Sequence, residues 1–156
     1  MYMEIAGIIA KQSYAKRLQV GAIVVKEDRI ISIGYNGMPA GWDNDCEKRV
    51  YSQIPQNLMS REQYHDENVG TYYLVTKPEV IHAEANAIAK LAKSSESGDG
   101  STMFLTHAPC LDCAKQMYTA GINKIYFQNH YKNNDGIDFL EKCGIKVEQC
   151  SIGENT

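Results

Sequence analysis

Hydrophobic residues recur at helical spacing near the start of the chain and then give way to two runs of β-branched residues. Isoleucines at positions 5, 8 and 9 lie among polar or small residues from Met3 to about Ala15, which predicts an amphipathic helix. The two runs are Val20 to Val25 and Ile30 to Tyr35, with four polar residues between them. Such runs around a short polar segment predict an antiparallel β-hairpin.

The middle of the chain lacks a sustained hydrophobic period. From Trp42 to about Pro78 the residues are largely polar and aromatic, and Ser60 is placed to cap a short helix. Loops longer than about 12–15 residues inside compact domains are usually functional or mobile. We therefore expect residues 42–78 to be an insertion that forms part of a pocket rim.

Helical and strand patterns alternate in the second half of the chain. The alanine-rich run from His82 to Ala92 predicts a helix, and the Ser94 to Ser101 segment, with two glycines, predicts a flexible loop. The remaining expected elements are a strand at 103–105, a helix at about 110–120, a strand at 124–127, a helix at 136–143 and a strand at 145–147. Together with the first helix and the hairpin, this order predicts a three-layer α/β/α domain on one mixed five-stranded sheet.

Composition and charge narrow the range of functions. The 156 residues include 16 Lys and Arg against 19 Asp and Glu, and they fit one globular domain spanning 1–156. This acidic balance disfavours a stable nucleic-acid partner. Apolar runs are much shorter than the roughly 20 residues of a membrane span and no signal peptide is recognisable, so we expect a cytoplasmic protein with no membrane partner. Five scattered cysteines favour metal binding or reduced thiols over a disulfide framework.

Two short motifs combine the side chains of a zinc site. His82 and Glu84 open one predicted helix, while Cys110 and Cys113 lie in the first turn of another, after Pro109. Residues three apart share a helix face, so both thiolates can reach one ion. Two sulfur ligands and one imidazole suit Zn²⁺ and leave its fourth position open for water, as in catalytic sites. Glu84 is too close to His82 to share the ion comfortably, and its position predicts a proton shuttle.

Each motif alone also has simpler explanations. A Cys-x-x-Cys pair fits a redox pair or a structural zinc knuckle, and a His-x-Glu at a helix start fits a capping or solvated role. The joint pattern, with one buried strand between the two helices, is the signature of zinc nucleobase deaminases. The sequence thus predicts His82, Cys110 and Cys113 as zinc ligands and Glu84 as the catalytic residue.

These motifs occur together with Val20-Gly21-Ala22 and with the stretch Gly34-Tyr35-Asn36-Gly37-Met38-Pro39-Ala40-Gly41. In this combination the chain resembles the deoxycytidylate (dCMP) deaminases of the cytidine deaminase-like superfamily, and the phage-encoded members in particular. The resemblance implies the cytidine deaminase-like fold and zinc-dependent hydrolysis of dCMP to dUMP and ammonia, which supplies dUMP for thymidylate synthesis. For a phage-encoded enzyme it also implies the host cytoplasm as the location.

The resemblance further implies which residues contact nucleotides. Asn36, Tyr131 and Ala83 would contact the substrate, and the four residues from Gly34 to Gly37 would belong to an effector site. Asn36 could instead adopt a left-handed turn conformation before Gly37, and Tyr131 could be an ordinary half-buried aromatic residue. The implied effectors are dCTP as activator, accompanied by Mg²⁺, and dTTP as inhibitor. They would act on a homo-oligomer, expected to be a hexamer.

Other functions and sites stay open at this point. A deaminase of another nucleoside, nucleobase or transfer RNA would share the zinc site, and a noncatalytic zinc-containing interaction module would not need Glu84. Cys46 and His65 invite a second metal site, but the single cysteine in this segment and the acidic neighbours of His65 favour a solvated histidine. Cys143 and Cys150 are expected to be small buried hydrophobic residues.

Overall fold

The computed structural model describes residues 1–58 and 61–150. Its helices are α1 (Tyr2–Ala10), α2 (Ala83–Ala92), α3 (Leu111–Thr119) and α4 (Asp135–Lys142), together with the short 3-10 helix η1 (Gln56–Leu58). Its strands are β1 (Gly21–Lys26), β2 (Arg29–Tyr35), β3 (Glu47–Val50), β4 (Gln63–Asp66), β5 (Gly70–Thr76), β6 (Thr102–His107), β7 (Lys124–Asn129) and β8 (Lys146–Gln149). The elements expected outside residues 42–78 are all present, with ends that differ by a few residues.

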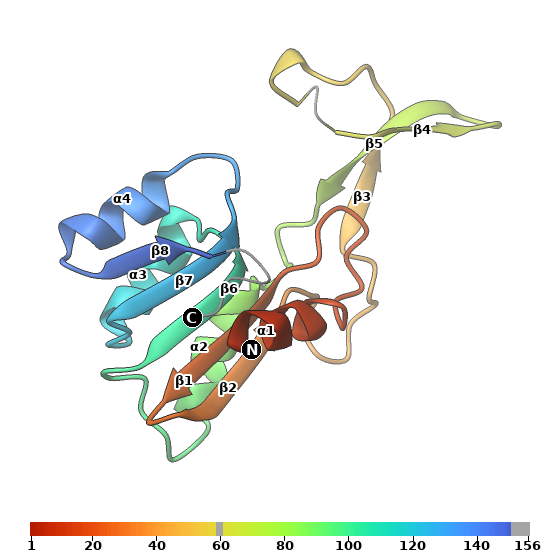
Figure 1. Cartoon of the computed structure of the whole chain (residues 1–156). Helices are drawn as coiled ribbons and strands as arrows, with labels where there is room; N and C mark the ends of the chain where they lie inside the picture. The colour runs from red at the N-terminus through yellow and green to blue at the C-terminus, as the bar shows by residue number, and fades with distance from the viewer. Residues whose placement is uncertain (59–60, 151–156) are drawn as a thin grey trace.

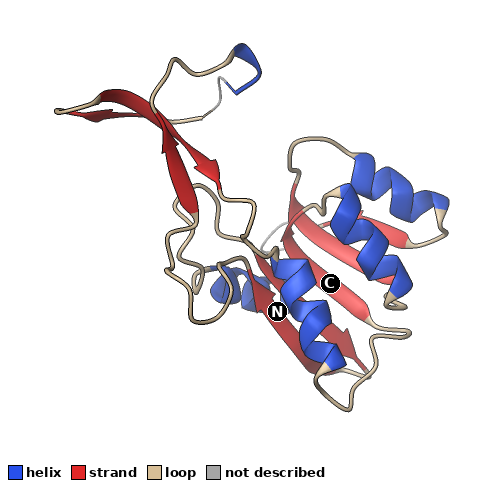
Figure 2. Cartoon of the chain, turned by 180° about the vertical axis from the view of Figure 1, so that it is seen from behind, coloured by secondary structure: helices blue, strands red, loops and turns tan. Residues whose placement is uncertain are grey.

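Five strands form the main sheet in the order β2-β1-β6-β7-β8. Strand β1 pairs antiparallel with β2 and β6, whereas β6, β7 and β8 run parallel. Helix α1 covers one face of this sheet, and α2, α3 and α4 cover the other (Figure 1, Figure 2). The prediction of a three-layer α/β/α fold on a mixed five-stranded sheet is confirmed. Among the described residues, no helix is long and apolar enough to cross a membrane.

Alternating side chains of β1 explain why the sheet is covered on both faces. Ala22 and Val24 are buried in the core that includes residues of α2, α3 and α4, while Ile23 and Val25 are buried with residues of α1. Successive residues of a strand point to opposite faces, so an apolar run without polar residues requires two covered faces. This run therefore fits helices on both faces of the sheet, and the pairing of β1 with β2 and with β6 places it inside the sheet.

Helix α1 is shorter than its hydrophobic pattern predicts. It ends at Ala10, because the chain turns there: the N–H of Ser13 donates to the carbonyl of Ala10, and the Ser13 hydroxyl donates to the carbonyl of Asn36. A serine side chain bonded to distant backbone competes with continuation of a helix. The predicted hairpin is confirmed, and a two-residue turn of positive φ connects β1 and β2.

Residues 42–78 contain a second antiparallel sheet, so the expectation of a segment without periodic structure is wrong. Its strand order is β3-β5-β4. Tyr64 of β4 stacks on Tyr72 of β5 with ring centroids 5.4 Å apart, and such cross-strand pairs stabilise a sheet that has little core of its own. This small sheet projects away from the main sheet (Figure 1, Figure 2). Ser60, expected as a helix cap, lies outside the described residues.

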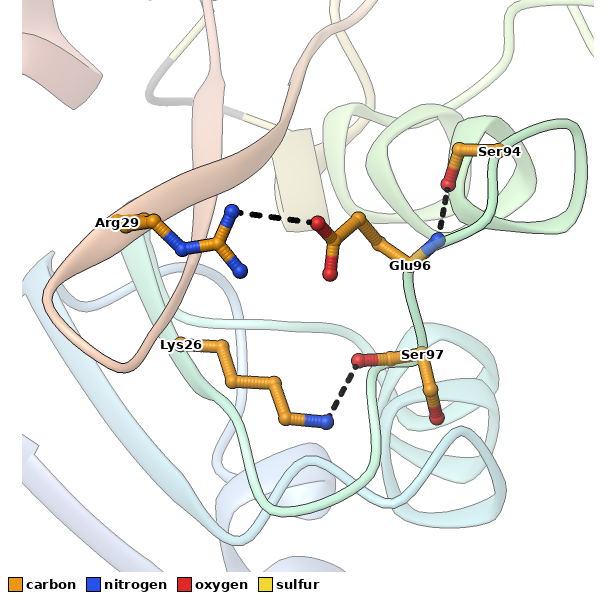
Figure 3. Close-up of polar contacts among 5 residues, drawn as sticks. All are labelled: Lys26, Arg29, Ser94, Glu96 and Ser97. Carbon is orange, nitrogen blue, oxygen red and sulfur yellow. Dashed lines mark hydrogen bonds and ion pairs between the residues drawn. The ribbon is translucent and has the colours of Figure 1, made fainter.

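The segment between α2 and β6, expected to be a flexible loop, contacts the β1–β2 hairpin (Figure 3). Arg29 Nη1 lies 3.4 Å from Glu96 Oε1, and Lys26 Nζ donates to the carbonyl of Ser97 at 3.2 Å. Exposed contacts of this kind contribute about 0–1 kcal/mol each. They attach the loop beside the start of β6, whereas the predicted zinc ligands lie beyond the end of β6.

Candidate active site

The predicted zinc ligands lie where two helices begin. His82 is the N-cap of α2, and Cys110 is the N-cap of α3, which follows β6 through Ala108 and Pro109. Cys113 lies in the first turn of α3 and shares a helix face with Cys110. A short loop joins β6 to α3, and Ile81, next to His82, bridges to Gly37 just after β2, so ligands distant in the sequence come together.

The three ligand atoms fit one tetrahedral metal ion. His82 Nδ1 lies 3.6 Å from Cys110 Sγ and 3.3 Å from Cys113 Sγ, and the three atoms lie within 4.8 Å of one another. With Zn–N of about 2.0 Å, Zn–S of about 2.3 Å and a tetrahedral angle, these N–S distances would be about 3.5 Å. The residues present therefore fit zinc, and thiolate with imidazole is a ligand set that zinc favours. Within residues 1–58 and 61–150, this is the one group of three or more His, Cys, Asp or Glu side chains close enough to hold an ion.

Helix α3 and His82 favour an ionised sulfur in this cluster. The N–H of Cys113 donates to Cys110 Sγ at 3.5 Å, so Cys110 caps the positive end of the helix. Hydrogen bonds with Cys113 and His82 lower the pKa of the Cys110 thiol to about 3. The hydrogen bond to Cys110 raises the pKa of both Cys113 and His82. Cysteine and histidine side chains must lose their protons to bind a metal ion, so zinc binding to these three groups would release protons.

Glu84 is buried beside the ligand cluster. It lies in the first turn of α2, is 4% exposed, and lines the same pocket as His82 and Cys110. Burial is the main cause that raises the pKa of its carboxyl to about 7, while the charge of His82 acts in the opposite direction. A carboxyl with a pKa near neutral pH can both accept and donate a proton.

These groups open into a pocket of about 270 Å³. Its wall also includes residues from the segment after α1, from the loop after β7 and from the small sheet. The residues 42–78 contribute Arg61, Val75 and Thr76. Residues 42–78 therefore line part of this pocket, and their being an insertion stays a prediction.

Asn36 and Tyr131 both line this pocket. The Asn36 amide is held by the backbone: Oδ1 accepts from the N–H of Val20 and Nδ2 donates to the carbonyl of Leu18, each at 2.8 Å. Neither Asn36 nor Gly37 has a positive φ, so the alternative of a left-handed turn is wrong. Substrate contact by Asn36 and Tyr131 stays a prediction.

Ala83 does not line the pocket. Its side chain is fully buried in the core, and its carbonyl oxygen lies where a Cβ added to Gly34 of β2 would overlap it. Gly34 thus has a packing role, because it allows α2 to approach β2 closely. Substrate contact by Ala83 stays a prediction. Because the side chain is buried, such a contact would have to come from the backbone N–H in the first turn of α2.

A second cavity, of about 290 Å³, adjoins the predicted effector residues. Tyr35, Asn36 and Gly37 line it, whereas Gly34 is buried under α2. Asn36 lines both cavities, so the two cavities share this residue. Effector binding at this position stays a prediction.

The other cysteines and His65 occupy separate positions in the fold. Cys46 is buried with Ala15 and Val80, and His65 is exposed on β4. Cys150 is buried, as expected. Cys143 is only half-buried, because it caps the C-terminal end of α4 at the edge of the helix layer.

The sequence patterns missed the basic side chains of the pocket. Arg17, Arg61 and Lys132 lie far apart in the chain, and only the fold brings them to one pocket. His107, at the end of β6, also lines it, and burial lowers the pKa of its imidazole. Strand β5 did carry a signal, since its Thr-Tyr-Tyr-Leu-Val-Thr run has high β propensity.

Comparison with known proteins identifies relatives over nearly the whole chain. The family model described as the cytidine and deoxycytidylate deaminase zinc-binding region matches residues 1–129. The deoxycytidylate deaminase of Enterobacteria phage T4 is 33% identical in an alignment of 165 positions, gaps included, that covers 93% of this chain and 86% of that protein. The crystal structure of the dCMP deaminase from the cyanophage S-TIM5, in complex with dCMP and dUMP, is 41% identical with a TM-score of 0.76 and covers 96% of this chain and 93% of that one.

A structure of lower sequence identity shares the same fold. The diaminohydroxyphosphoribosylaminopyrimidine deaminase/5-amino-6-(5-phosphoribosylamino)uracil reductase of Thermotoga maritima is 24% identical with a TM-score of 0.61, covering 95% of this chain and 35% of that one. At this identity the similarity shows the fold alone. The phage relatives confirm the resemblance to phage deoxycytidylate deaminases that the motifs indicate. The chain belongs to the cytidine and deoxycytidylate deaminase zinc-binding family.

Proposed function

We propose that this protein hydrolyses dCMP to dUMP and ammonia, with a zinc ion held by His82, Cys110 and Cys113. The observation that carries the proposal is that these three ligand atoms lie within 4.8 Å of one another, and that two of the ligands, His82 and Cys110, line one pocket with the buried Glu84. The deaminases of phage T4 and cyanophage S-TIM5 support dCMP as the substrate. A role in supplying dUMP for thymidylate synthesis belongs to the same proposal.

A zinc ion held by His82, Cys110 and Cys113 would supply a nucleophile at neutral pH, because it would lower the pKa of water from about 15.7 to about 7. Glu84 accepts a proton from the attacking water and donates it to N3 of the cytosine ring. Glu84 then takes the second proton of that water, from the hydroxyl now on C4, and transfers it to the amino group on C4, which leaves as ammonia. The water oxygen remains on C4 as the carbonyl oxygen of dUMP. Burial keeps Glu84 ready for both transfers, because it holds the carboxyl pKa near neutral pH.

The charge of the pocket supports a phosphorylated substrate. Three basic side chains line it, Arg17, Arg61 and Lys132, against one carboxylate, Glu84. Asn36 and Tyr131 are proposed to contact the nucleotide, since both line the pocket. A free nucleoside or nucleobase would leave these cations without an anionic partner.

Two alternatives make different predictions. Another deaminase of the superfamily would release ammonia from a nucleoside, a nucleobase or transfer RNA, and a noncatalytic zinc module would release none. Ammonia release from dCMP, deoxycytidine, guanine and transfer RNA therefore separates them. We expect dCMP to be the preferred substrate, and equal activity on deoxycytidine would contradict the proposal.

Regulation and assembly form a further part of the proposal. Activation by dCTP with Mg²⁺, inhibition by dTTP and a homohexamer in the cytoplasm are proposed on the resemblance to deoxycytidylate deaminases. The second cavity supports an effector site, because Tyr35 and Gly37 line it and Asn36 reaches both cavities. Allosteric coupling of about 1–3 kcal/mol would make the rate sigmoidal in dCMP alone and hyperbolic with dCTP. A hyperbolic curve that neither triphosphate moves would refute the regulation while leaving the zinc chemistry unaffected.

A further inference from the structure

The insertion brings a second arginine into the pocket. Arg61 follows η1 in the insertion and lines the same pocket as Arg17, which lies between α1 and β1. Strand β5 anchors both guanidinium groups. Arg61 Nη1 donates to the carbonyl of Leu74 at 2.7 Å, and Arg17 Nη1 donates to Thr76 Oγ1 at 2.8 Å. Because Leu74 and Thr76 are two residues apart on one strand, the two cations are held at the same end of β5.

Neither guanidinium forms an ion pair within the part of the chain that the structure describes. The ion pairs there involve other side chains, and both arginines donate to uncharged oxygens. Burial lowers the pKa of the Arg61 guanidinium, and repulsion by the positive charge of Arg17 lowers it further. An anion bound between them would replace this repulsion with attraction.

A phosphate group fits this pair of side chains. The planar guanidinium presents several N–H donors in a fixed geometry that matches phosphate oxygens. The substrate must place its cytosine ring near Glu84 and the zinc ligands, which come from the starts of α2 and α3. The two arginines come from a different part of the pocket wall, formed by residues 42–78 and the segment before β1. They can therefore contact the phosphate end of the nucleotide while the cytosine ring lies near Glu84.

We propose that Arg61 is a specificity-determining residue that, together with Arg17, binds the 5′-phosphate and selects the nucleotide over the nucleoside. This inference rests on the proposed function. It gives residues 42–78 a chemical role, because Arg61, between η1 and β4, is one phosphate ligand and Thr76 of β5 anchors the other. Lys132 also lines the pocket, but its side chain is exposed and lies over the ring of Tyr131.

The test measures kcat/KM for dCMP and for deoxycytidine on zinc-loaded wild type and variants. Arg61→Gln should lower kcat/KM for dCMP by about 10- to 100-fold, mainly through KM, because a charge-assisted hydrogen bond to phosphate is lost. The value for deoxycytidine should stay unchanged, since that substrate has no phosphate. Arg61→Lys keeps the charge without the planar donors, so it should lose less than Arg61→Gln.

Arg49→Gln is the matched control. Arg49 belongs to the same small sheet, but it pairs with Asp66 at 3.2 Å and lies over the ring of Tyr72 rather than in the pocket. It should keep the wild-type ratio of activity on dCMP to activity on deoxycytidine. The inference is overturned if zinc-loaded Arg61→Gln keeps the wild-type ratio, either because neither activity changes or because both fall equally. A wild type that does not prefer dCMP would refute the proposed substrate, and the inference with it.

Discussion

The backbone N–H of Arg17 donates a hydrogen bond to the carboxylate of Glu47, with 3.1 Å between the nitrogen and Oε1. The same oxygen accepts the N–H of Lys16 at 2.8 Å, and Glu47 is 3% exposed. Glu47 is the first residue of β3. The small sheet therefore fixes the backbone from which the Arg17 side chain enters the pocket.

Glu47→Ala removes this acceptor and leaves the two N–H groups without their partner. We expect the free energy of unfolding to fall by about 1–3 kcal/mol, because shielded donors are left unsatisfied, and the KM for dCMP to rise. Glu47→Gln retains a carbonyl acceptor, so its free energy of unfolding should fall less and its KM for dCMP should rise less. Denaturant unfolding together with steady-state kinetics measures the two effects, and a Glu47→Ala variant with wild-type stability and KM would refute this role.

Cys110→Ala should abolish stoichiometric zinc binding, since one of three protein ligands is lost. The matched control is Cys143→Ala, because Cys143 lies at the end of α4 and outside the ligand cluster. Elemental analysis of the purified proteins should give about one zinc per chain for wild type and for the control. Equal zinc in Cys110→Ala and wild type would exclude this residue as a ligand.

Gly34→Ala should destabilise the fold by about 1–3 kcal/mol or more, because overpacking forces the backbone to shift. An added Cβ would overlap the Ala83 carbonyl and lie 2.6 Å from the Ala87 nitrogen. The start of α2, and with it His82, would move, so zinc should also be retained less tightly. Gly7→Ala is the control: nothing lies within 4 Å of its added Cβ in α1, and stability should rise by about 0.5–1 kcal/mol. Equal unfolding midpoints for the Gly34 variant and wild type would show that α2 can give way.

Glu84→Gln should lower kcat for dCMP by about 10²- to 10⁴-fold, which is the usual contribution of general acid and base catalysis. The amide has the size of the carboxyl but cannot accept the proton from water. Zinc content should remain that of the wild type, because Glu84 is assigned no ligand role. Near wild-type turnover by Glu84→Gln would refute the role of Glu84 in proton transfer. Loss of zinc from this variant would refute the assignment of Glu84 as a residue that does not bind the metal.

Local patterns predicted the elements that hold the zinc ligands. The His82 and Cys110 helices follow from alanine content, Pro109 and ligand spacing, which are properties of neighbouring residues. The small sheet was missed because its strands are partly exposed, and pairs such as Tyr64 with Tyr72 form only across strands.

The basic wall of the pocket could not be predicted for a related reason. Neither Arg17 nor Arg61 itself belongs to a helix or a strand. Both are positioned by strand β5, through Thr76 and the carbonyl of Leu74. Their proximity therefore depends on the pairing of β3, β4 and β5, which hydrophobic periodicity alone does not specify.

The most direct test of the central claim is the product balance of the zinc-loaded protein with dCMP. We expect one dUMP and one ammonia for each dCMP consumed, measured by chromatography and by an ammonia assay on the same samples. Removal of the metal with a chelator should stop the conversion, and added zinc should restore it. A zinc-loaded protein that forms no dUMP, or that converts dCMP equally well after complete removal of zinc, would contradict the claim.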